Sequence, residues 1–143
     1  RAQLVATDIS AAAIETASAN ALQLGISNIE FRRGDWCDAL ADMTFDLIVS
    51  NPPYIKDADP HLQQGDVRFE PRSALAAGVQ GMDDLARIAH CAQQHLRAGG
   101  WLLMEHGYDQ CDAVTQLLAS CDFRNITDHR DDAGQSRVIS GLY

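Results

Sequence analysis

The fold is decided by the stretch Phe45-Asp46-Leu47-Ile48-Val49-Ser50-Asn51-Pro52-Pro53-Tyr54. Its first six residues form an apolar run with β-branched side chains, which is typical of a buried strand. That strand must stop at Asn51-Pro52-Pro53-Tyr54, because neither proline can donate to a β-ladder and each ring fixes φ. The sequence therefore predicts a stiff turn at the carboxyl end of a parallel strand, which is where open α/β sheets bind ligands.

The turn from Asn51 to Tyr54 carries groups that suit a planar amine. The Asn51 amide offers an acceptor oxygen and two donor hydrogens, and the Pro52 carbonyl has no neighbouring proline N–H to compete for it. Tyr54 adds an aromatic face. Together these groups could hold an –NH2 group by both hydrogens and stack against its plane. The plainer interpretation is a turn that only ends a strand, but such a turn needs one proline and no aromatic residue.

Strands and helices alternate along the rest of the chain. Apolar runs predict further strands over residues 3–8, 29–33, 101–106, 123–129 and 137–142. Helical spacing predicts helices over residues 11–24, 84–97 and 111–120. Ser10 can cap the first of them and Gly25 ends it, whereas Asp83 can cap the second and Gly99-Gly100 ends it. Residues 131–134 are a hairpin signal. We expect an α/β fold, a doubly wound and mostly parallel sheet with helices on both faces and a C-terminal antiparallel hairpin.

The other candidate functional residues also follow strands. Asp8 ends the first expected strand, where an acid can accept both hydroxyls of a ribose; a helix-capping role just before Ser10 is equally compatible with its position. Asp35 and Trp36 follow the strand at residues 29–33 and could bind an adenine, the carboxylate taking the exocyclic amine and the indole packing on the ring. Taken alone, this pair is also typical of a surface turn with a half-buried tryptophan.

Composition narrows the class of protein. The 143 residues are 46% hydrophobic, enough for one domain with a sizeable core. The net charge of −9 argues against a broad nucleic-acid footprint or an anionic membrane surface. The four cysteines show no Cys-x-x-Cys spacing and the five histidines are scattered, so we expect no metal site. With no run of transmembrane length and no signal peptide, we expect a cytoplasmic protein without a membrane partner.

The chain resembles a known family in several separate motifs. Asn51-Pro52-Pro53-Tyr54 after an apolar strand looks like the catalytic motif of S-adenosylmethionine-dependent amino-methyltransferases. Three further segments resemble the peptide chain release factor glutamine-N5 methyltransferases of HemK type. They are the Gly34-Asp35-Trp36 turn, the segment Leu103-Met104-Glu105-His106-Gly107, and the segment Phe69-Glu70-Pro71-Arg72-Ser73-Ala74-Leu75 with Gly78, Gly81 and Asp83-Asp84-Leu85 after it. The last of these lies mostly in a polar stretch, residues 55 to about 81, expected to be a functional or mobile loop.

The resemblance implies a fold, a cofactor and a role for each residue of the motif. It implies a class I methyltransferase fold, Rossmann-like, and S-adenosylmethionine as cofactor. Asp8 would hold the cofactor ribose, and Asp35 and Trp36 its adenine. Asn51 would bind both cofactor and substrate amide, with Pro52, Pro53 and Tyr54 completing the substrate pocket, and the catalytic residues would be Asn51, Pro52 and Tyr54. Glu70 matches a position without an assigned role. The expected substrate is a glutamine side chain of a peptide chain release factor, in translation termination.

One part of the family pattern has no counterpart in the sequence. The first strand and glycine-rich turn of such a fold should precede Asp8 by about 20 residues, and the sequence begins at Arg1. We therefore expect residues 1–143 to be a partial catalytic domain that neither folds stably nor binds cofactor by itself. The strands that begin near Gln3 and Phe45 would lack the neighbour that they share and would each keep an unpaired edge.

Three other functions remain compatible with the sequence. An adenine-N6 methyltransferase acting on nucleic acid would use the same Asn51–Tyr54 turn on an exocyclic amine, although the net charge and the segment around Glu70 favour a protein substrate. A glutamine of a ribosomal protein could be the acceptor instead. The chain could also be a non-catalytic remnant that only binds a partner, although the intact set of Asp8, Trp36 and Asn51 argues against decay.

Overall fold

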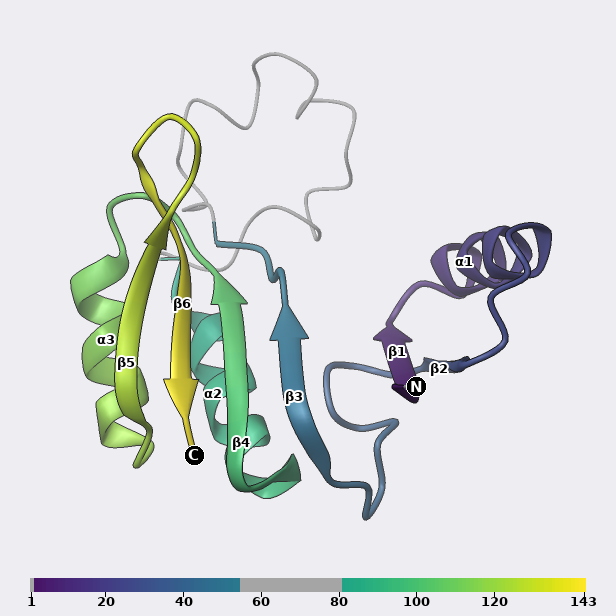
Figure 1. Cartoon of the computed structure of the whole chain (residues 1–143), viewed down its shortest axis with the longest axis horizontal. Helices are drawn as coiled ribbons and strands as arrows, with labels where there is room; N and C mark the ends of the chain where they lie inside the picture. Colours follow the sequence, from purple (N-terminus) through teal and green to yellow (C-terminus); the bar gives the residue numbers. More distant parts are fainter. Residues whose placement is uncertain (1, 55–80) are drawn as a thin grey trace. The chain divides into compact units, whose positions relative to one another are not determined.

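A computed structural model describes residues 2–54 and 81–143, and the expected loop and Glu70 lie outside these described residues. The chain divides into two compact units, Arg1–Met43 and Thr44–Tyr143. Figure 1 labels the helices and strands of both.

The first unit is a strand–helix–strand motif. It consists of β1 (Leu4–Asp8), α1 (Ala11–Gln23) and β2 (Ile29–Arg33), and the two strands pair in parallel from Leu4 opposite Ile29 to Asp8 opposite Arg33. The Ser10 side chain accepts a hydrogen bond from the Ala13 N–H at 3.3 Å, so the expected N-cap is confirmed. Gly25 follows the helix with a φ of +67°, the left-handed conformation that glycine adopts without steric cost.

The second unit is a four-stranded mixed sheet with two helices. Its elements are β3 (Phe45–Ser50), α2 (Asp83–His95), β4 (Leu96–Glu105), α3 (Cys111–Ser120), β5 (Arg124–Arg130) and β6 (Ser136–Leu142). The strand order is β3-β4-β6-β5. β3 and β4 are parallel, whereas β6 runs antiparallel to both of its neighbours, which confirms the antiparallel hairpin at the end of the chain.

Both helices of the second unit cover the same face of its sheet (Figure 1). Leu102, Met104 and Ile139 have no exposed surface on that face, and the helices bury Leu85, Ala89, Val114 and Leu118 against them. Because strand side chains alternate, the opposite face carries Leu47 and its register partner Trp101, which are 52% and 38% exposed. Within this unit the described helices therefore cover one face, not two.

Two of the strands have an unpaired edge. Among the described residues, β1 pairs only with β2, and β3 is the terminal strand of its sheet with β4 as its neighbour. Among the described residues, each of the two strands therefore keeps one unpaired edge.

The boundary between α2 and β4 differs from the prediction. The helix ends at His95 and not at Arg97, because Leu96 pairs with Phe45 in the β-ladder and the Arg97 guanidinium binds the Asp46 carboxylate at 2.7 Å. Gly99 and Gly100 therefore lie inside β4. The helix also begins one residue early, at Asp83, and its N-cap position is Met82, which makes no side-chain capping bond.

Candidate functional site

The ends of β1 and β2 are tied together within the first unit. The Gly34 N–H donates to the Asp8 carbonyl at 3.1 Å, and the Thr7 hydroxyl donates to the Trp36 carbonyl at 3.2 Å. These bonds hold the turn after β2 beside the end of β1, as expected for parallel strands that end at one edge of a sheet. Asp8 and the Asp35-Trp36 pair thus come together at that edge.

The Asp8 side chain is exposed, and its two carboxylate oxygens have different surroundings. Its Oδ1 accepts the N–H of Ser10 at 2.7 Å, whereas the first turn of α1 is capped by the Ser10 side chain. None of the described residues donates to its Oδ2. One carboxylate oxygen therefore shapes the entry to α1, while the other remains available to a hydroxyl of a bound ligand.

The Gly34-Asp35-Trp36 turn is tight and strained. A Cβ on Gly34 would lie 2.6 Å from the Ala39 Cβ and 2.9 Å from the Ala39 nitrogen, so only glycine fits. Trp36 is half-buried and has a φ of +50°, which is rare for a bulky side chain. Such a conformation costs about 1–3 kcal/mol and is found most often at ligand-binding sites.

In the second unit, the Asn51–Tyr54 turn follows β3 and is joined to the end of β4. The Tyr54 hydroxyl donates to Glu105 Oε1 at 2.8 Å. The pKa of Tyr54 is raised to about 12, mainly by burial. The hydrogen bond to the Glu105 carboxylate and the negative charge of Glu105 raise it further, whereas the positive charge of Arg137 lowers it. The phenol is therefore a neutral donor at physiological pH.

The other members of the turn leave polar atoms open. The Asn51 side chain is exposed, whereas Pro52 is buried and Pro53 is half-buried. In the part of the chain that the structure describes, no donor reaches the Asn51 amide oxygen or the Pro52 carbonyl oxygen. These are the two acceptors that the sequence assigns to an –NH2 group.

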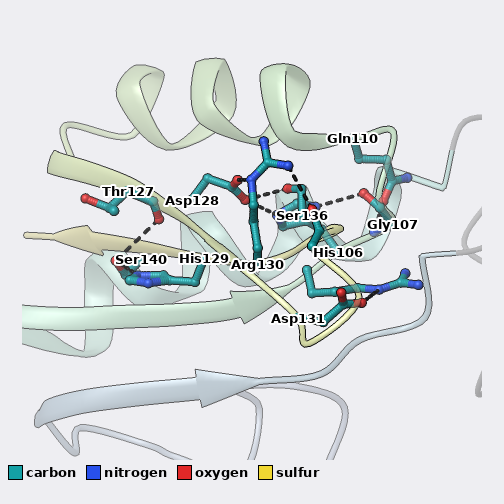
Figure 2. Close-up of polar contacts among 12 residues, drawn as sticks. His106, Gly107, Gln110, Thr127, Asp128, His129, Arg130, Asp131, Ser136 and Ser140 are labelled. Carbon is teal, nitrogen blue, oxygen red and sulfur yellow. Dashed lines mark hydrogen bonds and ion pairs between the residues drawn. The ribbon is translucent and has the colours of Figure 1, made fainter.

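A buried glutamine connects this turn to two other segments. Gln110, 5% exposed, donates from its Nε2 to the Tyr54 carbonyl and to the Gly81 carbonyl, both at 3.1 Å. Its Oε1 accepts the Gly107 N–H at 2.8 Å (Figure 2). Gly81 has a φ of +68°, and a Cβ there would lie 2.2 Å from the Tyr54 oxygen, so the close approach requires glycine.

A second polar cluster lies beyond the end of β4 and joins it to the β5–β6 hairpin (Figure 2). His106 is fully buried, and its Nδ1 lies 2.9 Å from the Gly107 carbonyl oxygen. Its Nε2 lies 3.8 Å from Asp128 Oδ1 and makes no hydrogen bond to any described residue. The Ser136 hydroxyl donates directly to Asp128, and Arg130 lies 3.9 Å from the same carboxylate. Among the described residues the Ser136 hydroxyl contacts the Asp128 carboxylate and no histidine, so this order is not a serine–histidine–acid arrangement.

Sequence reasoning assigned no role to Glu105 or Gln110. A signal for Gln110 was present, because it occupies the N-cap position of α3, where Ser, Thr, Asp or Asn is preferred. Its side chain makes no capping bond there. A glutamine in that position indicates a side chain with partners elsewhere.

No helix among residues 2–54 and 81–143 is long and apolar enough to cross a membrane. The arrangement that remains consists of two strand-end sites, one in each unit. The first presents a carboxylate and an aromatic residue, and the second presents two oxygen acceptors and an anchored phenol.

Comparisons with known proteins find methyltransferases. Residues 1–67 match a family model described as "Methyltransferase small domain". The chain is 50% identical over 141 residues to the release factor glutamine methyltransferase of Xylella fastidiosa, covering 99% of this chain and 51% of that protein. The protein of the same name from Escherichia coli is 44% identical over 141 residues, with the same coverage. The chain thus spans about half the length of the curated relatives that it matches.

Solved structures give the fold. A methyltransferase from Pyrococcus furiosus superimposes with a TM-score of 0.71 at 17% identity, covering 98% of this chain and 62% of that one. An rRNA methylase from Streptococcus thermophilus gives a TM-score of 0.58 at 17% identity, covering 98% and 72%. The expected class I methyltransferase fold is confirmed.

Proposed function

We propose, from the premise that this chain belongs to the release factor glutamine methyltransferases, that the protein at its full natural length methylates the side-chain amide of a glutamine in a peptide chain release factor. The methyl donor is S-adenosylmethionine, and the reaction takes place in the cytoplasm. The observation that carries the proposal is the Asn51–Tyr54 turn, where two oxygen acceptors receive no hydrogen bond from any described residue and the Tyr54 phenol is anchored to Glu105.

The acceptor amide is held by the turn. The Asn51 side-chain oxygen and the Pro52 carbonyl accept its two N–H hydrogens, with Pro53 lining the pocket and Tyr54 packing on the amide plane. A hydroxyl or carboxylate in the same place would leave one or both acceptors unpaired, so the turn selects an –NH2 group. The absence of a described donor on either oxygen supports this assignment.

Residues of the first unit fit the cofactor. The open Oδ2 of Asp8 suits a ribose hydroxyl, and the strained turn at Asp35 and Trp36 suits an adenine. Asn51 contacts the cofactor as well as the amide. When bound, S-adenosylmethionine supplies an electrophilic methyl group on a sulfonium.

The protein contributes positioning more than acid–base chemistry. A carboxamide nitrogen is a weak nucleophile because its lone pair is delocalised into the carbonyl. Two hydrogen bonds at Asn51 and Pro52 orient that lone pair and favour its pyramidalisation, and positioning of this kind supplies up to about 7–11 kcal/mol in favourable cases. No strong base is required, since the nitrogen loses its proton after it has been methylated. The neutral Tyr54 phenol agrees with this scheme.

Substitution of Asn51 tests the proposal. Asn51→Ala should lower kcat for release factor methylation at least ~100-fold, the effect of removing one well-placed polar group. Asn20→Ala is the matched control, because Asn20 is exposed on α1, and it should leave kcat unchanged. A near-normal kcat for Asn51→Ala would reject the assignment.

A second candidate rests on the same turn. The two acceptors fit the exocyclic amine of an adenine as well as a carboxamide, so an adenine-N6 activity on nucleic acid shares this geometry. The net charge of −9 favours a protein acceptor. Radiolabelled methyl transfer to a release factor, to a ribosomal protein and to an adenine-containing oligonucleotide, measured side by side, decides among the three acceptors.

A further inference from the structure

We propose that Gln110 is the positioning residue of the amide-binding turn, a role that rests on the function proposed above. Its side chain fixes the carbonyl of Tyr54, the last residue of that turn. It acts on the acceptor through Tyr54 and does not itself contact the substrate.

A single carboxamide satisfies three backbone groups from three separate segments. The Nε2 donates to the Tyr54 and Gly81 carbonyls, and the Oε1 accepts the Gly107 N–H. Tyr54 and Gly81 lie directly before and after residues 55–80 in the sequence. Gln110 therefore holds Tyr54 and Gly81 beside Gly107, just after the carboxyl end of β4.

Tyr54 is consequently fixed at two points. Glu105 accepts the hydrogen bond of its phenol, and Gln110 donates to its carbonyl. With only the first contact, the ring would keep its anchor while the main chain of the turn could shift. A displacement of about 1 Å in a positioning element can lower a rate about 100-fold, so the second contact matters for orienting the amide nitrogen.

Few other side chains can replace this glutamine. Glutamate has the same shape, but as a carboxylate it has no donor and places a charge against two carbonyl oxygens. Methionine has a similar length but leaves all three backbone groups without their partner, and each buried unsatisfied group is destabilising. Asparagine is one methylene too short to keep the three contacts together.

The chain offers a matched control. Gln93 on α2 is partly buried and donates from its Nε2 to the Cys121 carbonyl at 2.9 Å, at the end of α3. Gln93→Met removes a side chain-to-backbone hydrogen bond of the same kind without touching the turn. The change in kcat/KM of Gln93→Met therefore shows how far a general loss of stability lowers activity.

The experiment compares Gln110→Met, Gln110→Glu and Gln93→Met in the protein at its full natural length, each assayed at the same interval below its own Tm. We expect kcat/KM for the release factor to fall at least ~10-fold in both Gln110 variants, on the scale of one unsatisfied buried group. We expect a change of less than about threefold in Gln93→Met. The Kd for S-adenosylmethionine, measured by calorimetry, should change less than kcat/KM in every variant.

The pH profile gives a second readout that does not depend on the Met variant folding. In Gln110→Glu, protonation of the introduced carboxylate would restore one O–H donor, so the ratio of Gln110→Glu to wild-type kcat/KM should rise as pH falls. Equal losses in Gln110→Met and Gln93→Met, or a pH-independent ratio for Gln110→Glu, would overturn the positioning role. If the wild-type protein methylates no release factor, the proposed function fails first, and that result is distinct from a failure of Gln110 alone.

Discussion

The Tyr54 hydroxyl donates a hydrogen bond to the Glu105 carboxylate at 2.8 Å, joining the turn after β3 to the last residue of β4. The two residues are 51 positions apart in the sequence. Hydrogen bonds to an ionised acceptor are stronger than those between neutral groups. The bond therefore restrains the tyrosine ring at the end of the turn that carries Asn51 and Pro52.

A double-mutant cycle should detect coupling between Tyr54 and Glu105. Because both side chains are half-buried, we expect a coupling free energy of about 1.5 kcal/mol, at the low end for hydrogen bonds to charged groups. The measurement is the free energy of unfolding in denaturant for Tyr54→Phe, Glu105→Gln and the double variant. Tyr143→Phe is the control, since the Tyr143 ring contacts Phe123 and its hydroxyl has no partner among the described residues. Additive single effects would contradict the prediction.

Alkaline pH should weaken the same contact. The folded pKa of Tyr54 is raised from 10.0 to about 12, first by burial and then by Glu105. Because the pKa of Tyr54 is higher in the folded state, the neutral phenol contributes its full stabilisation below the unfolded pKa of 10.0. This stabilisation is lost as pH rises from about 10 to about 12. The difference in free energy of unfolding between wild type and Tyr54→Phe should therefore shrink over this window. The other tyrosines titrate in both proteins and cancel, so a constant difference would show that Tyr54 does not ionise as expected.

Gly81→Ala should disturb the turn at the point where Gln110 holds it. A methyl group there would lie 2.2 Å from the Tyr54 carbonyl oxygen, at a φ of +68°. Gly134→Ala provides the comparison, because its φ is +80° but no atom lies within 4 Å of the added carbon. We expect Gly134→Ala to lower the free energy of unfolding by about 1 kcal/mol. Gly81→Ala should lower it by about 1–3 kcal/mol more through overpacking, and only Gly81→Ala should lower kcat/KM. Equal effects of the two substitutions on stability and activity would show that the turn relaxes around the methyl group.

Secondary structure followed from the sequence wherever the local pattern was clear. The strands at Ile29–Arg33 and Phe45–Ser50 and the helix at Cys111–Ser120 have the expected bounds, because apolar spacing and turn residues agree there. The prediction failed at Leu96 and Arg97, whose apolar and basic side chains fit a helix. The pairing of Leu96 with Phe45 and the ion pair of Arg97 with Asp46 favour a strand there instead.

The candidate site was predictable only in part, for a physical reason. Asp8, Trp36 and Asn51 could be named because parallel strands place their carboxyl ends at one edge of a sheet. The position of Gln110 at the start of α3 is unusual, but its role could not be named, because two of its partners are main-chain carbonyls 56 and 29 residues away, and carbonyls leave no mark in a side-chain pattern. Glu105 belongs to a segment that the resemblance identified, but its bond to Tyr54 depends on the pairing of β3 with β4.

Acid should weaken the β5–β6 hairpin through Asp131. Its Oδ1 accepts the Ala133 and Gln135 N–H groups, both at 2.9 Å, and its Oδ2 accepts the Arg137 Nε–H at 3.1 Å. The backbone bond from Gln135 is the largest of the effects that hold the pKa of Asp131 below its usual value. Because the pKa of Asp131 is lower in the folded state, the ionised carboxylate stabilises the fold above the unfolded pKa of 3.8. This stabilisation is lost as pH falls through the folded pKa.

The difference in free energy of unfolding between wild type and Asp131→Asn should therefore be largest near neutral pH and should decrease below about pH 4. Asp132→Asn is the matched control, since Asp132 is the exposed neighbour in the same turn, and its difference from wild type should stay small at every pH.

The hairpin strand β6 pairs with β4 directly beside Glu105, which lies opposite Val138. Loss of the turn should therefore also reach the Tyr54 anchor, and kcat/KM of Asp131→Ala should fall with its stability. A variant that lost stability but kept full activity would separate the hairpin from the candidate site.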